Sequence, residues 1–230
     1  MTESAAHDAR RLLRRADAGM LATASHRFDG HPFGSVVRYA LDGGGRPLIL
    51  ISRLAEHTRN IEGDPRVSLV AVEQGDDARA DARVTVVGRC TALRPDDPAP
   101  ARYLRRFPDA ESLLALGDFA FFRIEPLSVR FIAGFGRIHW LPPEAILTGD
   151  GAIAAAEPHL LAELAAVDLA SLWARHATPP ADPVAACAVD ADGIELRAGN
   201  RLLRLDFSEP ARDAAAARAA LQQLLTGTAP

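Results

Sequence analysis

The stretch LILISRLAEHTRNIEGDPRVSLVAVE, residues 48–73 of this 230-residue chain, decides the fold. An apolar run comes first, a short polar stretch with helical spacing follows, and a Gly-Asp-Pro stop precedes a second apolar run. This order predicts a strand, a helix over residues 55–62, and another strand. Ser52, His57 and Asn60 gather where the first strand passes into the helix. Backbone N–H groups and the positive end of a helix dipole meet there, which makes the junction a natural phosphate seat.

Composition excludes several classes of function. All 26 basic residues are arginine, so chemistry that needs lysine, such as a Schiff base, is excluded. The net charge of −4 gives no excess of positive charge for nucleic acid. Cys90 and Cys187 form neither a disulfide framework nor a metal-binding spacing, and Cys90 lies in an apolar run that predicts a buried strand. Because no apolar run approaches the roughly 20 residues of a membrane span, and no signal peptide begins the chain, we expect a cytoplasmic protein without a membrane partner.

Short apolar segments separated by turns predict a barrel in the first part of the chain. We expect strands over residues 20–25, 33–41, 47–52, 67–72, 83–93, 119–125 and 129–135. An amphipathic helix over residues 7–18 precedes them, and Pro108 divides a helical excursion over residues 95–116. Pro126 is expected to separate the last two strands. This arrangement favours an antiparallel barrel over a parallel sheet.

Pro142 and Pro143 interrupt the chain, and the composition then shifts towards alanine and leucine. We expect helices within residues 152–175, a three-strand meander over residues 183–190, 194–198 and 202–207, and a final helix over residues 213–225 with Ser208 or Asp213 as its cap. The sequence therefore predicts the α+β class. A barrel of six to seven strands with short helices occupies residues 1–145, and a small α+β domain occupies residues 146–230.

Several local signatures occur in a fixed order in the first domain. They are GHPFGS at 30–35, Ser52 with HTRN at 57–60, DPRVSL at 64–69, Gly88, DF at 118–119 and GFGR at 134–137. Together they resemble the pyridoxamine 5′-phosphate oxidase-like split-barrel superfamily, and within it the haem-utilisation branch, over about residues 12–141. The second domain resembles the small α+β module often fused to this barrel. A histidine-rich motif common in that module is missing from the segment around His159.

The resemblance implies an antiparallel split β-barrel that forms a homodimer, with small-molecule pockets at the interface built from both chains. It also implies flavin mononucleotide (FMN) as the usual ligand. The haem branch holds haem instead, and some of its members degrade haem oxidatively.

The residues that we expect to bind the cofactor are Ser35, Arg38, Ser52, Arg53, His57, Thr58, Asn60 and Arg137. A flavin phosphate needs N–H donors and cations. Glu56 and His57 stand where the oxidases keep a cationic clamp, so Arg38, Arg53 and Arg59 are the available replacements.

Each of these assignments has a structural alternative. His57 and Asn60 are also suited to capping the helix and binding the neighbouring strand, and Ser35 is also suited to an ordinary strand position. Arg137 is equally suited to a salt bridge at the dimer interface.

Haem iron needs a histidine, cysteine or tyrosine ligand. His139 is the best-placed candidate for the metal, because it follows the last expected barrel strand and has Trp140 beside it to pack against a macrocycle. The alternative for His139 is a partly exposed side chain packed on the second domain. No catalytic residue is assigned. Two functions remain open: an FMN-dependent oxidoreductase of unknown substrate, and a non-catalytic haem-binding, carrier or regulatory protein that has lost flavin.

Overall fold

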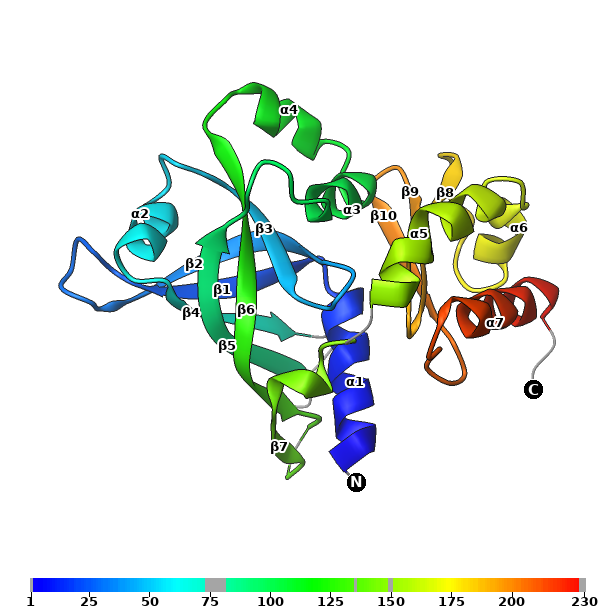
Figure 1. Ribbon diagram of the computed structural model, residues 1–230, viewed down its shortest axis with the longest axis horizontal. Helices are drawn as coiled ribbons and strands as arrows, with labels where there is room; N and C mark the ends of the chain where they lie inside the picture. The colour runs from blue at the N-terminus through cyan, green and yellow to red at the C-terminus, as the bar shows by residue number, and fades with distance from the viewer. Residues whose placement is uncertain (1, 73–81, 135, 149–150, 228–230) are drawn as a thin grey trace. The chain divides into compact units, whose positions relative to one another are not determined.

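The computed structural model describes residues 2–72, 82–134, 136–148 and 151–227. The chain forms two compact units, one of residues 1–104 with 108–148 and one of residues 105–107 with 149–230 (Figure 1). Within the described residues, no helix has both the length and the apolar character needed to cross a bilayer.

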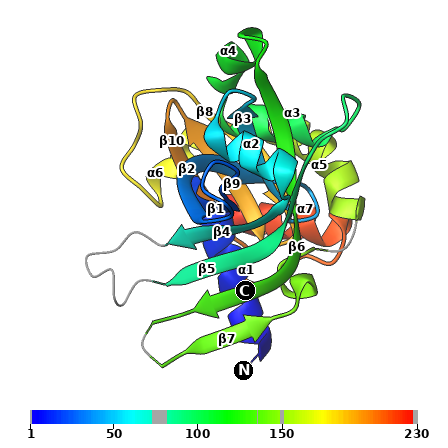
Figure 2. The same ribbon diagram turned by 90° about the vertical axis from the view of Figure 1, so that its left-hand side faces the viewer.

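The first unit is a seven-stranded antiparallel sheet closed into a barrel. Its elements are α1 (Thr2–Arg15), β1 (Ala18–Ala24), β2 (Pro32–Leu41), β3 (Pro47–Ser52), α2 (Glu56–Gly63), β4 (Arg66–Val72), β5 (Arg83–Ala92), α3 (Ala99–Arg106, which ends in the second unit), α4 (Ala110–Ala115), β6 (Phe119–Ile132), β7 (Ile138–Leu141) and a 3₁₀ turn (Pro143–Ala145). The strand order is β3-β2-β1-β4-β5-β6-β7, and β6 also pairs with β3 (Figure 2). This second pairing closes the barrel.

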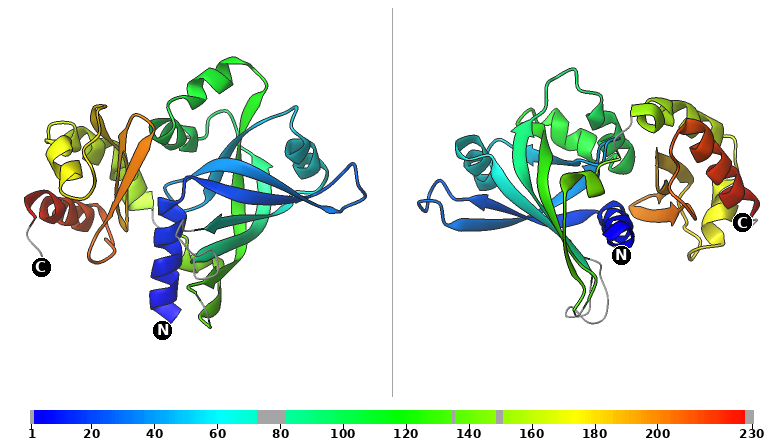
Figure 3. Two further views of the ribbon diagram at one scale, coloured as in Figure 1. Left: turned by 180° about the vertical axis from the view of Figure 1, so that it is seen from behind. Right: turned by 60° about the horizontal axis from the view of Figure 1, so that its bottom comes forward.

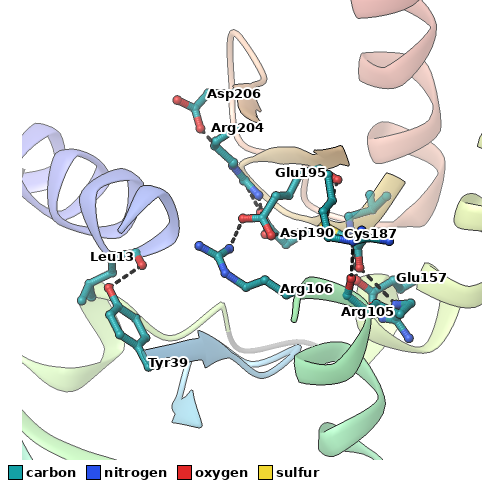
Figure 4. A network of polar contacts seen from close by, with 12 residues as sticks. Leu13, Tyr39, Arg105, Arg106, Glu157, Cys187, Asp190, Glu195, Arg204 and Asp206 are labelled. Carbon is teal, nitrogen blue, oxygen red and sulfur yellow. Dashed lines mark hydrogen bonds and ion pairs between the residues drawn. The ribbon is translucent and has the colours of Figure 1, made fainter. Parts of the chain in front are cut away.

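Helix α1 packs on the barrel core through one apolar face. Ala5, Ala9, Leu12 and Leu13 are buried in the same cluster as the inward residues of the strands. The Tyr39 hydroxyl donates a hydrogen bond of 2.8 Å to the Leu13 carbonyl and fixes the end of the helix on β2 (Figure 4). The helix begins earlier than expected because Ala5 and Ala9 continue the apolar face towards the N-terminus.

The last long barrel segment, expected as two strands, is the single strand β6. The prediction that Pro126 breaks it was wrong. Gly88 of β5 pairs with Pro126 whereas Val87 pairs with Ser128, so the register shifts and β6 carries one extra residue. Such a bulge accommodates proline, which has no N–H for the ladder. A Cβ on Gly88 would lie 2.3 Å from the Glu125 carbonyl oxygen, so only glycine fits opposite the bulge.

The second unit is a three-stranded sheet with helices on one face (Figure 3). Its elements are α5 (Gly151–Leu164), α6 (Leu169–Ala174), β8 (Val184–Asp190), β9 (Gly193–Ala198), β10 (Arg201–Asp206) and α7 (Ala214–Thr226). Asp213 caps α7 by accepting a hydrogen bond of 2.8 Å from the Ala216 N–H, one of the two caps expected. The predicted α+β class, with an antiparallel split barrel followed by a small α+β domain, is confirmed.

The second unit contains a buried network of arginines and carboxylates (Figure 4). Arg204 binds both carboxylate oxygens of Asp190, at 2.8 and 2.6 Å, and reaches Asp206 at 3.2 Å. Arg106 pairs with the buried Glu195. Burial alone would lower the pKa of Arg204, but the adjacent Asp190 carboxylate more than offsets this and raises it. The guanidinium of Arg204 therefore stays charged inside the protein.

A second arginine pair of the same unit comes from the last turn of α3. Arg105 donates a hydrogen bond of 2.7 Å to Glu157 on α5, and its Nε donates one of 3.0 Å to the Cys187 carbonyl. Residues 105–107 are thus part of the second unit although they lie far from its other residues in sequence.

Candidate functional site

The junction between β3 and α2 is organised around Ser52. The Ser52 hydroxyl donates a hydrogen bond to the Asp118 carboxylate and accepts one of 3.0 Å from the Leu54 N–H. The Ser52 carbonyl accepts a hydrogen bond of 2.6 Å from the Thr58 hydroxyl. Asp118 precedes β6, so a carboxylate from a distant part of the chain occupies the hydroxyl expected to face a phosphate.

Asn60 joins α2 to the hairpin of β1 and β2. Its side-chain oxygen accepts a hydrogen bond of 2.8 Å from the His26 N–H, and its amide nitrogen donates one of 3.0 Å to the Thr23 hydroxyl. Asn60 and Thr58 are both buried. Their polar groups are therefore directed at the protein itself, as in the structural alternative for Asn60.

The three arginines near this junction all contact protein acceptors. Arg38 donates a hydrogen bond of 2.7 Å to Asp109, and Arg53 donates one of 2.6 Å to the Gly117 carbonyl. Arg59 lies 3.9 Å from Glu56. These side chains are exposed, so each contact is weak. Two of the cations that a phosphate would need, Arg38 and Arg59, thus lie beside carboxylates, and Arg53 contacts a backbone carbonyl.

His57 occupies the first turn of α2 and contacts β2. Its Nδ1 lies 3.2 Å from the Ser35 hydroxyl oxygen, so the structure brings these two expected residues together. Its Nε2 is buried and has no hydrogen-bond partner among the described residues. Burial lowers the pKa of His57 below its ordinary 6.5, so the ring is neutral at pH 7.

The two expected residues at the end of the barrel lie apart from the β3–α2 junction in sequence and on a different strand pair. Arg137 is exposed and donates a hydrogen bond of 2.5 Å to the Ala133 carbonyl. We expected His139 to follow the last barrel strand, but it lies within β7, opposite Phe131. Successive strand residues point to opposite faces, so the side chains of His139 and Trp140 leave β7 on opposite sides.

A row of side chains that the sequence did not reveal crosses the outer face of the sheet, and we call it the outer row. It consists of Val36, Met20, Val70, Thr85, Arg130 and Trp140, each directly opposite the next on neighbouring strands. Val36 is 73% exposed, Trp140 is 61% exposed and Met20 is also exposed, whereas Val70, Thr85 and Arg130 are half-buried. The Arg130 guanidinium lies 5.1 Å from the centre of the Trp140 ring. Strand alternation could have placed these residues on one face, but only the register aligns them.

No group of three or more His, Cys, Asp or Glu side chains suited to a metal ion occurs in the described part of the chain. A metal held by a set of protein ligands therefore has no support there. A metal carried by a macrocycle needs only one protein ligand, so this observation does not bear on haem.

The family model described as CREG, β-barrel, matches residues 1–147. The chain is 36% identical over 133 residues to the Arabidopsis thaliana protein named "Non-canonical heme oxygenase HOZ, chloroplastic". That match covers 57% of this chain and 41% of the plant protein, so the chain spans less than half of that relative.

Two solved structures resemble nearly the whole chain. The protein Atu2129 of Agrobacterium tumefaciens, of unknown function, has a TM-score of 0.80 at 28% identity and is covered over 94% of its length by 96% of this chain. A haem-binding protein from Mycobacterium smegmatis has a TM-score of 0.58 at 28% identity, with 97% of this chain and 96% of that chain covered.

The family model describes a β-barrel, and the residues that it matches, 1–147, contain the antiparallel barrel closed by β6. The haem proteins among the similar chains agree with the expected haem-utilisation branch. The chain therefore belongs to the CREG β-barrel family, a group of split barrels like that of pyridoxamine 5′-phosphate oxidase with haem-utilisation relatives.

Proposed function

We propose that this protein binds haem, as a carrier or regulatory protein, and does not depend on flavin. The observation that carries the proposal is the state of the β3–α2 junction, where the Asp118 carboxylate holds the Ser52 hydroxyl and Glu56 stands in the first turn of α2. The similarity to a plant haem oxygenase and to a mycobacterial haem-binding protein supports the same ligand class.

A flavin phosphate fits this junction poorly. The phosphate would bring its negative charge close to the Asp118 carboxylate, which holds Ser52, and close to Glu56 at the start of α2. Anions near a helix N-terminus are stabilised by about 0.3–1 kcal/mol, which a neighbouring carboxylate offsets through like-charge repulsion.

Haem makes different demands, and the residues present meet two of them. Haem needs an apolar surface for its ring, cations for its propionates and one neutral ligand for its iron. Val36, Met20 and Trp140 of the outer row supply exposed apolar area, and Arg130 lies among them. His57, whose Nε2 is buried and unpartnered, contacts Ser35 and so lies on the other face of β2 from Val36. When bound, haem would supply a redox-active iron.

We also propose that two copies of the chain associate through the outer row, with the ligand pocket at their interface. Exposed large apolar side chains on a sheet face, here Val36, Met20 and Trp140, are typical of an interaction surface rather than of a solvated one. The outer row is continuous over six strands, and a twofold axis would set it against its own copy. Light scattering at micromolar concentration tests this proposal. A monomeric mass would rule out a pocket shared by two chains.

Titration of the purified protein with haemin and with FMN tests the ligand. We expect a Soret band that survives gel filtration, and flavin absorbance that is lost on dialysis. Retained flavin bands without haem uptake would favour the second candidate, an FMN-dependent oxidoreductase, for which the strand–helix junction is the supporting feature. Loss of the Soret band when ascorbate is added in air would indicate that the protein degrades haem as an oxygenase and is not a carrier.

A further inference from the structure

Resting on the proposed haem binding, we propose that Arg38 binds a carboxylate of the ligand and that Asp109 is an autoinhibitory carboxylate, which holds Arg38 until the ligand displaces it. The ligand class is a flat apolar molecule that carries carboxylates, as haem carries its propionates. The place of Arg38 on β2 and its contact with Asp109 at the start of α4 support this inference.

The first support is the position of Arg38 on the outer face of β2. Pro32, Gly34, Val36 and Arg38 are exposed, whereas the residues between them are half-buried or buried. Side chains alternate between the two faces of a strand, so Arg38 lies on the same face as Val36 of the outer row. Two residues are roughly 7 Å apart along a strand, so a guanidinium borders the exposed apolar area.

The second support is the group that Arg38 contacts now. Its Nη1 donates a hydrogen bond of 2.7 Å to a carboxylate oxygen of Asp109, which is 71 residues away in the chain. A ligand carboxylate would make the same kind of charge-assisted hydrogen bond with this guanidinium. It would also be repelled by the negative charge of Asp109 if Asp109 stayed in place. Binding at Arg38 therefore exchanges one carboxylate for another.

The third support is the weak attachment of Asp109. The side chains of Arg38 and Asp109 are 47% and 66% exposed, so their ion pair contributes about 1 kcal/mol or less. Helix α4, which begins directly after Asp109, buries one of its six residues, Ala110. A segment with so few buried contacts opens at a small cost in free energy.

The chain after α4 allows this helix to move by itself. Gly117 follows the helix with φ of +80°, a conformation that glycine adopts without strain. Asp118, the next residue, is fixed to the β3–α2 junction by its contact with Ser52. Asp109 can therefore leave Arg38 while the β3–α2 junction stays intact.

The test compares haemin with its dimethyl ester, in which both propionates are esterified, by Soret titration of full-length variants. We expect Asp109→Asn to bind haemin about two- to fivefold more tightly, which is the effect of losing an exposed ion pair. The affinity for the ester should not change, because the ester offers no carboxylate to Arg38. The gain should shrink in 1 M salt, where charges are screened beyond about 3 Å.

Two further variants show whether the gain comes from Arg38. Glu111→Gln is the matched control, since it removes one negative charge from an exposed position of α4, and it should leave haemin binding unchanged. In an Arg38→Met background, Asp109→Asn should no longer tighten haemin binding, because the cation that Asp109 holds is gone. A gain that persists without Arg38, or that the ester shares, would overturn the inference.

The outcomes separate this inference from the function on which it rests. If neither the wild-type protein nor Asp109→Asn takes up haemin, haem binding is rejected and the inference falls with it. If the wild-type protein binds haemin and Asp109→Asn binds it no more tightly, only the autoinhibitory role is rejected. Far-UV circular dichroism of each ligand-free variant shows that it is folded. If Asp109→Asn does not fold, Asp109→Ser takes its place, because serine also suits the residue before a helix.

Discussion

Replacement of Arg204 by methionine tests the buried ion network of the second unit. Arg204, Asp190 and Asp206 have side chains that are only 4% exposed, so none of these charges is stabilised by bulk water. Arg204→Met keeps an unbranched apolar side chain but removes the guanidinium that neutralises both carboxylates. We expect the second unit to be strongly destabilised, because two carboxylates would remain buried without that cation.

The structure sets the size of the effect. Arg204 makes three hydrogen bonds to carboxylates, at 2.8, 2.6 and 3.2 Å. Each hydrogen bond to a charged group is worth about 1.5–3 kcal/mol, and the desolvation of Arg204 that the substitution relieves offsets part of the sum. Removing one partner of a buried pair costs about 3–5 kcal/mol, and we expect a loss in that range. With a urea dependence of about 1 kcal/mol per molar, the midpoint falls by roughly 3–5 M.

The chain offers a clean optical probe for this measurement. Its two tryptophans lie in different units, Trp140 in the barrel and Trp173 buried in the second unit. In a Trp140→Phe background, urea unfolding followed by fluorescence therefore reports on the second unit alone. Arg218→Met is the matched control and should barely move the midpoint, since Arg218 and Glu163 form an exposed pair. A loss below about 1 kcal/mol in Arg204→Met would refute the reasoning, because the pair would then be behaving like a surface ion pair.

Three further predictions concern the barrel unit. Gly88→Ala should cost about 1–3 kcal/mol in denaturant unfolding, because its Cβ would meet the Glu125 carbonyl at 2.3 Å. Gly34→Ala in β2, whose Cβ would lie 3.4 Å from the Met20 sulfur, should be close to neutral. Burial raises the pKa of the Cys90 thiol to about 12, so a thiol reagent at pH 8 should label Cys90 only after unfolding, and rapid labelling of the native protein would contradict this expectation. The contribution of the neutral thiol to stability should be lost as the pH rises from 9 towards 12. Because burial lowers the pKa of His57, the stability associated with its neutral ring is present above pH 6.5 and is lost as the pH falls below it. The difference between the urea midpoints at pH 7 and pH 5 should therefore be smaller in His57→Gln than in the wild-type protein. An equal difference in the two proteins would exclude the effect.

The sequence predicted the elements whose signals are local. The apolar runs on either side of α2, the division of the helical excursion at Pro108 and the Asp213 cap all depend on neighbouring residues, and the structure contains each of them. Pro126 failed as a strand breaker because its tolerance depends on Gly88, which lies opposite it but distant in sequence.

The candidate site shows the same limit. His57 and Ser35 were each expected at the site, but their contact joins α2 to a strand distant in sequence and follows only from the fold. The hydrogen bond from Ser52 to Asp118 could not be foreseen, because it joins the end of β3 to the start of β6, two segments that are distant in sequence. Whether the residues of the junction bind a ligand stays a prediction.

The double pairing of β6 has a consequence for synthesis of the chain. β6 joins β5 on one edge and β3 on the other, and β3 is translated long before it. Until Phe119–Ile132 has left the ribosome, β3 and β5 therefore present unpaired edges on a half-built sheet. Nascent chains in that interval are prone to pair with one another, so the yield of folded protein should rise with slower initiation or added chaperone.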